Sequence, residues 1–301
     1  MMSMLEKWKK EIGAAEIIPV APRLMEAKWP GTDADPYALL PTVKTMLLMV
    51  LPYRSFEWNQ DEAQINAFYP AFQEGRMTAL KLVEILKREG FSAVNAPNLP
   101  LKSIAAGTGR FQYGRNSLTG IKEYGTRFTL QCVLTDCEIE PVEWVEEFIL
   151  SDMCKNCGAC IKACPTGAIR GDGTLDAKKC LRNLPYNEVI AEEFREKLGA
   201  SLYGCDMCQS VCPRNALQNP CAPSDELREA LLLKKLLKGD YKPLAPFLGA
   251  NYARKNRVMG RAALIAGNIG GKDLLPLLEE IVQKGESPMS EHAAWAIDRI
   301  R

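Results

Sequence analysis

The chain has 301 residues, of which 47% are hydrophobic and 25% charged, a composition typical of a soluble globular protein with two or three domains. The formal net charge of +1 excludes a global attraction to nucleic acid, so any such binding has to come from a local patch. No apolar run reaches the roughly 18 residues of a membrane span, and we expect none. Eleven cysteines without a visible export signal indicate a reducing cytoplasm, where thiolates hold metal.

Helical and extended patterns alternate through the first half of the chain, which predicts an α/β sandwich over residues 1–150. Helices are expected over 3–13 and 63–88, the second interrupted by Pro70, and strands over 15–20, 44–53, 91–94 and 127–134. The strand over 44–53 is apolar throughout, as in a strand buried on both faces. Loops are expected over 22–41 and from 95 to about 123.

The long loop is rich in glycine at Gly107, Gly109, Gly114 and Gly120. Glycine lets the backbone approach a flat or bulky ligand closely. The alternative is an ordinary glycine-rich surface loop. The loop lacks the dinucleotide-binding pattern of three spaced glycines between a strand and a helix.

Residues 154–165 follow the pattern C-x2-C-x2-C-x3-C-P of bacterial two-cluster ferredoxins. In that pattern the fourth cysteine of a run binds the other cluster, and two [4Fe–4S] clusters need eight cysteines, which are present here. One cluster is assigned to Cys154, Cys157, Cys160 and Cys212, and the other to Cys164, Cys180, Cys205 and Cys208. An isolated Cys180 and a helix expected over 187–198 make this an elaborated ferredoxin-like domain, over residues 151–222.

Other interpretations of these cysteines fit less well. Zinc sites favour paired C-x2-C spacing, often with histidine, and the only histidine of the chain is His292. A disulfide framework belongs to exported proteins. Cys132, Cys137 and Cys221 exceed the number of ligands that two clusters need, and we expect Cys132 to be buried on a strand. His292 is expected to pack on a helix.

The last part of the chain, residues 223–301, has the pattern of paired helices. They are expected over 225–237, 257–269, 274–284 and 290–300. Alanines suited to close packing make the pairs resemble HEAT repeats. The segment 234–261 carries eight Lys or Arg residues and one acidic residue, which is either a nucleic-acid patch or a solvated helical face.

Four stretches together resemble the epoxyqueuosine reductase family, which makes the queuosine base of tRNA and is related to reductive dehalogenases. They cover most of the chain: Asp35–Tyr53, Val94–Ser117 with Gly109 and Gly114-Arg115-Asn116-Ser117, the cysteine run with Cys180, and Gly260–Asn268 with His292–Ala296.

The resemblance implies an oxidoreductase with cobalamin beside its clusters. Cobalamin would be bound by Gly109, Tyr113, Gly114, Arg115, Asn116 and Ser117. The clusters would take electrons one at a time from a low-potential donor, such as flavodoxin or ferredoxin, and pass them to cobalt for reduction of epoxyqueuosine in tRNA. The segment 234–261 would contact the tRNA, and the protein is expected to be a cytoplasmic monomer.

Asn95 departs from the family, which carries an aspartate there as the proposed proton donor. An Asn amide donates a hydrogen bond but delivers no proton at neutral pH. The proton then comes from water or Tyr113, or the substrate differs. The alternatives are therefore a corrinoid-binding iron–sulfur protein that transfers electrons or reduces corrinoids, and a reductase of another substrate.

Overall fold

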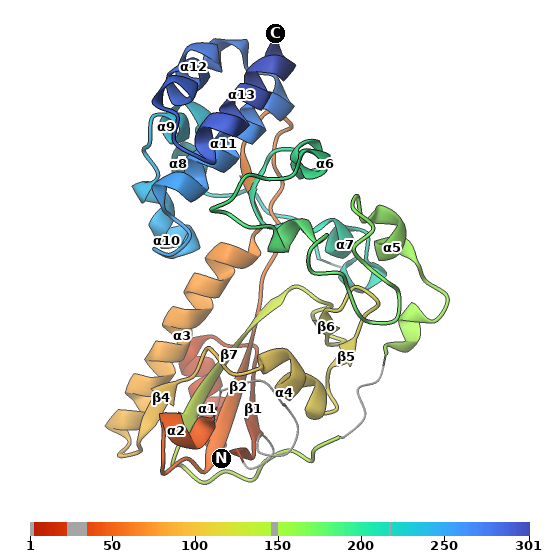
Figure 1. The fold of residues 1–301 in the computed structure, drawn as a ribbon. Helices are drawn as coiled ribbons and strands as arrows, with labels where there is room; N and C mark the ends of the chain where they lie inside the picture. The colour runs from red at the N-terminus through yellow and green to blue at the C-terminus, as the bar shows by residue number, and fades with distance from the viewer. Residues whose placement is uncertain (1–2, 23–34, 146–149, 217) are drawn as a thin grey trace. The chain divides into compact units, whose positions relative to one another are not determined.

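The computed structural model describes residues 3–22, 35–145, 150–216 and 218–301 (Figure 1). The chain forms two compact units. The first comprises residues 1–53, 71–157 and 213–217, and the second comprises 54–70, 158–212 and 218–301. The segments 1–150, 151–222 and 223–301 predicted as domains stay a prediction; part of the middle one lies in each unit. No described helix is long and apolar enough to cross a bilayer.

A four-stranded antiparallel sheet forms the centre of the first unit (Figure 1). Its order is β1 (Glu16–Val20), β2 (Thr45–Pro52), β7 (Phe128–Thr135) and β4 (Ala93–Asn95). Leu48 of β2 pairs with Ile18 on one side and Cys132 on the other. Every predicted strand of this unit is present, within three residues of its expected ends.

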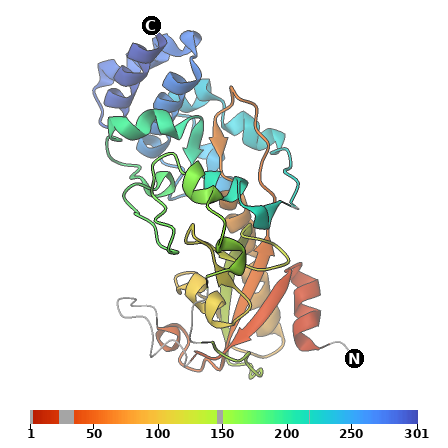
Figure 2. The same ribbon diagram turned by 90° about the vertical axis from the view of Figure 1, so that its right-hand side faces the viewer.

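Helices cover both faces of this sheet, as the apolar pattern of β2 predicts. The helices of this unit are α1 (Met4–Ile12), α2 (Pro36–Leu39), α3 (Phe68–Arg88) and α4 (Leu101–Gly107). Leu47 packs in one hydrophobic core with residues of α1 and α3, and Leu48 in another with residues of α4. Figure 2 shows α1 and α4 on opposite sides of the sheet. The mixed α/β fold is therefore confirmed.

The helix predicted over 63–88 is wrong at its start. Gln64–Ile65 form the short strand β3, which pairs in parallel with β8 (Ser201–Tyr203) in the second unit. The side chain of Asn66 accepts the backbone N–H of Phe68 at 2.8 Å, and α3 begins there. Pro70 does not interrupt α3, because it lies in the first turn, where backbone N–H groups have no partner within a helix.

Further elements differ from the sequence-based expectation. The helix predicted over 225–237 is divided into α8 (Asp225–Ala230) and α9 (Leu233–Leu237), and the loop predicted over 22–41 contains α2. The loop predicted from 95 to 123 contains α4 and the hairpin of β5 (Gln112–Tyr113) and β6 (Thr119–Gly120). The helix predicted over 187–198 is reduced to α6 (Glu192–Arg195) and a 3-10 turn, Glu196–Leu198. The N–H of Ile190 donates to the ring of His292 at 2.8 Å. That N–H is therefore not available for a helix that starts before it.

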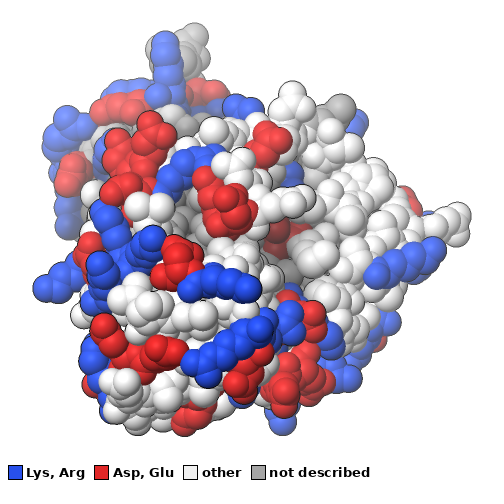
Figure 3. All heavy atoms as spheres, turned by 90° about the horizontal axis from the view of Figure 1, so that it is seen from above, with Lys and Arg blue, Asp and Glu red and all other residues white. Residues whose placement is uncertain are grey.

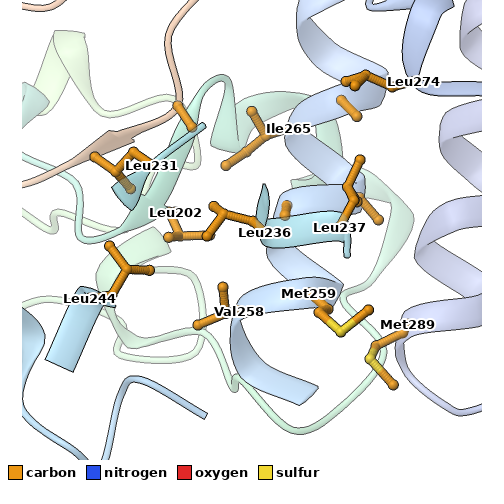
Figure 4. Close-up of a cluster of buried hydrophobic side chains, with 14 of the residues drawn as sticks. Leu202, Leu231, Leu236, Leu237, Leu244, Val258, Met259, Ile265, Leu274 and Met289 are labelled. Atoms are coloured by element: carbon orange, nitrogen blue, oxygen red, sulfur yellow. The ribbon is translucent and has the colours of Figure 1, made fainter. Parts of the chain in front are cut away.

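Short helices surround the cysteines of the second unit, and a helical array forms the rest of it. These helices are α5 (Ala159–Ala163), α7 (Met207–Ser210), α8 (Asp225–Ala230), α9 (Leu233–Leu237), α10 (Ala245–Leu248), α11 (Lys255–Ile269), α12 (Leu275–Lys284) and α13 (Met289–Ile300). Figure 4 shows Leu236, Val258 and Ile265 within one apolar core. A Cβ added at Gly267 of α11 would lie 2.9 Å from the Cα of Ala296 on α13, so these helices pack closely through small residues, as predicted.

His292 is a packing residue, as the sequence predicts. Its side chain lies in the second unit and is 2% exposed. The N–H of Ile190 donates to Nε2 at 2.8 Å, so Nε2 carries no proton, and Nδ1–H donates to the carbonyl of Gly260 at 3.0 Å. Burial lowers the pKa of His292 to about 4. The imidazole is therefore neutral at neutral pH.

The low pKa of His292 makes stability fall in acid. Between about pH 6.5 and 4 the unfolded chain binds a proton at this histidine and the folded chain does not. Stability is therefore lost as pH falls, by about 2 kcal/mol between pH 7 and pH 5. Denaturant unfolding of the wild type and of His292→Gln at both pH values measures this. The variant is expected to lose less, and equal losses would contradict the role.

Candidate functional site

Three of the four cysteines assigned to the second cluster come together in the second unit. Cys164 follows α5, Cys180 precedes the 3-10 turn Leu181–Asn183, and Cys205 and Cys208 flank the start of α7. Burial raises the pKa of the Cys205 thiol, a hydrogen bond from the backbone of Met207 opposes this, and the charges of Asp206, Cys180 and Cys164 raise the pKa further. The charges of Cys164 and Cys180 thus act on Cys205, as expected for ligands of one cluster.

Cys164 already has the surroundings of a thiolate ligand. Its Sγ accepts the backbone N–H of Ala168 at 3.3 Å and lies 3.6 Å from the hydroxyl of Thr166. Burial raises the pKa of Cys164, but these hydrogen bonds outweigh it and the pKa is lowered overall. N–H···S hydrogen bonds also tune the reduction potential of an iron–sulfur cluster.

The other predicted quartet is divided between the two units. Cys154 and Cys157 belong to the first unit, where the N–H of Cys157 donates to the carbonyl of Cys154 at 3.2 Å. Cys160 and Cys212 belong to the second. This ligand set stays a prediction from the spacing.

The eleven cysteines are all free. In the described part of the chain, no three His, Cys, Asp or Glu side chains converge on a point that one metal ion could fill. A cubane cluster does not need such a point, because each cysteine binds a different iron. Cys132 is fully buried on β7, as predicted, and burial raises its pKa to about 12. Cys137 is also buried, and the thiol of Cys221 points to the carbonyl of Ser55 at 3.6 Å.

The residues Gly114 to Ser117, predicted to bind cobalamin, form the tip of the β5–β6 hairpin. The N–H of Gly114 donates to the carbonyl of Leu118 at 2.8 Å. The tip reverses through Ser117, whose φ of 63° is left-handed. Asn116 is 4% exposed, and its Oδ1 accepts the N–H of Leu118 at 3.3 Å. The side chain of Asn116 and the backbone bond of Gly114 thus stabilise the tip.

This hairpin contacts the segment that carries the first two cysteines, within the first unit. The N–H of Ser151 donates to the carbonyl of Tyr113 at 2.8 Å, and Nη2 of Arg115 donates to the carbonyl of Lys155 at 2.9 Å. Lys155 follows Cys154 directly. The loop that resembles a corrin-binding region thus lies beside two predicted cluster ligands.

The glycine density of the loop has causes inside the protein. The ring of Trp144 occupies the space that a side chain at Gly107 would need, and the guanidinium of Arg214 does the same at Gly120. At these two positions glycine therefore accommodates the protein's own side chains, which the sequence analysis did not anticipate. No sequence signal marks Trp144, and Arg214 is notable only for following the Cys-Pro pair.

Four buried side-chain polar atoms of the first unit have no hydrogen-bond partner among the described residues. Two are on β7, in Thr129 and Gln131, and the other two are Oδ1 of Asn95, at the end of β4, and Nε of Arg115, in the hairpin. Asn95 pairs with Val133 through the backbone, which leaves its side chain free to contact a ligand. An unmet acceptor and an unmet donor suit a ligand that carries amide groups, as cobalamin does. The residues present therefore fit the cofactor that the family implies.

The basic segment 234–261 is partly neutralised in the folded chain. Lys234, Lys235 and Lys255 form ion pairs with Asp273, Glu229 and Glu286 at 2.6–2.8 Å. Figure 3 shows Lys and Arg interleaved with Asp and Glu over the charged part of the face seen there. These lysines behave as a solvated helical face.

The chain is similar to known proteins both in its cysteine segment and over its whole fold. Residues 153–215 match the family model described as a 4Fe-4S double cluster binding domain. The epoxyqueuosine reductase of Bacillus subtilis (strain 168) is 31% identical over 218 residues, which are 69% of this chain and 55% of that protein. A solved structure of the Bacillus subtilis enzyme, with its catalytic aspartate loop swung out of the active site, superposes with a TM-score of 0.78 at 26% identity, over 98% of this chain and 89% of that one.

The chain is a relative of the epoxyqueuosine reductases. A second epoxyqueuosine reductase structure, solved with an epoxyqueuosine-modified tRNA-Tyr stem loop, matches with a TM-score of 0.77 at 25% identity, again over 98% of this chain and 89% of that one. The chain spans about half the length of the first curated relative. The predicted resemblance to the epoxyqueuosine reductases is therefore confirmed, and the chain carries a double-cluster iron–sulfur domain.

Proposed function

We propose that this protein is a cobalamin-dependent iron–sulfur oxidoreductase that reduces epoxyqueuosine to queuosine in tRNA. The observation that carries the proposal is the fold match over 98% of the chain to epoxyqueuosine reductases, one of them solved with its modified tRNA stem loop. That match covers both units, so it includes the double-cluster segment and the sheet with the Asn95 and Arg115 loops.

Two [4Fe–4S] clusters would transfer the electrons. Cys164, Cys180, Cys205 and Cys208 hold one of them, and Cys154, Cys157, Cys160 and Cys212 the other. The proximity of Cys164, Cys180 and Cys205 supports the first set. The electrons come singly from a low-potential carrier such as flavodoxin or ferredoxin.

Cobalamin would be held in the first unit. When bound, it supplies a strongly reducing metal centre for opening an epoxide. Nε of Arg115 would donate a hydrogen bond to it and Oδ1 of Asn95 would accept one, since both atoms are buried without a partner among the described residues. The hairpin from Tyr113 to Ser117, with Gly109 before it, gives the backbone wall of the site. Its contacts with Ser151 and Lys155 keep that wall beside Cys154.

In the proposed reaction, Asn95 positions the epoxide but supplies no proton. Its amide can donate and accept hydrogen bonds, but it has no proton to deliver at neutral pH. The proton that ring opening consumes therefore comes from water or from the Tyr113 hydroxyl.

The same residue favours a second candidate function. A chain with Asn95 in place of the family's aspartate suits a corrinoid-binding iron–sulfur protein that transfers electrons, or a reductase of another substrate. Incubation of the loaded protein with tRNA bearing epoxyqueuosine separates the candidates. The first forms queuosine, and the second leaves the nucleoside unchanged.

The protein acts as a cytoplasmic monomer. Residues 1–150 bind the corrinoid, 151–222 bind the clusters, and the HEAT-like helices of 223–301 contact tRNA. The lysines and arginines of 234–261 that form no ion pair in the described chain, Lys238 and Lys242 among them, would contact its phosphates.

A further inference from the structure

Aromatic rings and arginines gather in one place in the second unit, outside the cysteine and cobalamin sites. We call this group the tyrosine–arginine surface. It consists of Phe68, Tyr69, Tyr186, Tyr203 and Tyr252 together with Arg182, Arg257 and Arg261. These residues come from four separate stretches of the chain.

The rings form a continuous cluster with a buried base and a half-buried rim. Tyr203 lies 4.8 Å from Tyr186 and 5.5 Å from Tyr252, between ring centroids. Tyr203 is 1% and Tyr69 6% exposed. Tyr186, Tyr252 and Phe68 are half-buried and form the rim. The base fixes the rings of the rim in place.

Arg261, on α11, is a buried cation without an acidic partner. It is 3% exposed, and its guanidinium lies 4.9 Å from the ring centroid of Tyr186. Nη2 donates to the carbonyl of Pro185 at 3.5 Å, and Nε has no partner among the described residues. A buried charge normally requires a counter-charge. No carboxylate of the described chain forms an ion pair with it, so its positive charge is uncompensated beneath the rim.

The other two arginines lie at the rim and are held by neutral groups. Arg182 stacks on Phe68, 4.1 Å from its centroid. Arg257 donates from Nε to the side chain of Asn187 at 3.0 Å and from Nη1 to the carbonyl of Asn251 at 2.8 Å. Neither arginine forms an ion pair within the described residues. The rim therefore presents oriented, uncompensated guanidinium groups beside half-buried aromatic residues.

We infer that the tyrosine–arginine surface binds unpaired RNA nucleotides. Unpaired bases stack on aromatic rings and on guanidinium planes, and phosphates pair with arginine. The aromatic rings and arginines of this surface therefore suit single-stranded RNA. A duplex hides its base faces and could use only the charges. The inference rests on the proposed function for the identity of the RNA. It adds that the loop of the tRNA, and not its stem, contacts Tyr186, Tyr252, Arg182 and Arg257.

Binding measurements on the full chain with its clusters test this. The probes are a short RNA stem-loop and a fully paired RNA duplex of the same length. Tyr252→Ala keeps the backbone carbonyl that accepts the Tyr203 hydroxyl. It is expected to weaken stem-loop binding about tenfold, from the loss of one stacked base, and to leave duplex binding unchanged. Arg257→Ala should weaken stem-loop binding and lower its salt dependence by about one ion.

The matched control is Lys255→Ala. Lys255 lies on the same helix as Arg257, is exposed, and is paired with Glu286, so its removal should change stem-loop binding less than about twofold. A second measurement needs no variant. A 2-aminopurine base in the loop should lose fluorescence when it stacks on the wild-type protein. Any one of three results would overturn the inference. These are an unchanged fluorescence, equal losses of stem-loop and duplex binding in the variants, and displacement of the RNA by an acidic peptide of equal charge.

The outcomes distinguish a failure of the inference from a failure of the proposed function. A wild type that reduces epoxyqueuosine, while Tyr252→Ala and Arg257→Ala bind the stem-loop normally, overturns the surface and leaves the reductase in place. A wild type whose stem-loop binding depends on both residues, but which leaves epoxyqueuosine unreduced, overturns the reductase and supports the surface.

Discussion

Asn95→Asp is expected to raise turnover on epoxyqueuosine tRNA by about 10²–10⁴-fold, the usual contribution of a correctly placed general acid. Asn and Asp have nearly the same shape, so the packing around β4 should not change. Oδ1 of Asn95 is buried and has no donor among the described residues. A carboxyl group there is poorly solvated and unpaired, which raises its pKa and favours the protonated acid.

The rate of queuosine formation measures this effect. Iron content and the EPR spectrum of bound cob(II)alamin should match the wild type, so that a change in rate reports on chemistry. Asn219→Asp makes the same substitution at an exposed position outside the proposed cofactor, cluster and RNA sites, and should not change the rate. If the wild type is active and Asn95→Asp gains nothing, the proton already comes from water or Tyr113, and the idea of a missing acid is wrong.

Cys180→Ser is expected to remove one cluster and leave the other, so that bound iron falls from about eight to about four per chain. Cys180 is the isolated ligand, and it lies beside Cys164 and Cys205 in the second unit. Serine replaces the thiolate by a hydroxyl, which iron–sulfur clusters accept poorly. Epoxide reduction should be lost as well, because electrons no longer pass through both clusters.

Iron and sulfide analysis after anaerobic reconstitution measures the loss, and EPR of the reduced protein shows which signal is gone. Cys221→Ser is the matched control, because Cys221 is also half-buried in the second unit but lies outside both predicted ligand sets. It should keep about eight irons. A full complement of iron in Cys180→Ser would remove Cys180 from the ligand set.

The sequence predicted well those elements that depend on residues close together along the chain. The apolar run of β2 predicted a strand buried on both faces, and the alanine-rich helices α11 and α13 pack closely as expected. The cysteine spacing predicted a double-cluster domain, because ligand geometry leaves few alternatives for that pattern.

The sequence could not reveal what depends on distant contacts. β3 forms only because Gln64 and Ile65 meet β8, more than a hundred residues later. The glycines of the 95–123 loop suggested a ligand, whereas Trp144 and Arg214 pack on two of them. The tyrosine–arginine surface joins Phe68 to Tyr252 across the chain, and no local pattern signals it.

The most direct test of the account is nucleoside analysis of epoxyqueuosine-bearing tRNA. The tRNA is first incubated with wild-type protein that holds both clusters, together with cobalamin and a low-potential reductant. The account predicts that queuosine appears, and that it does not appear when cobalamin or the reductant is omitted. Unchanged epoxyqueuosine, from protein that holds about eight irons and binds both cobalamin and the tRNA, would contradict the assignment as an epoxyqueuosine reductase.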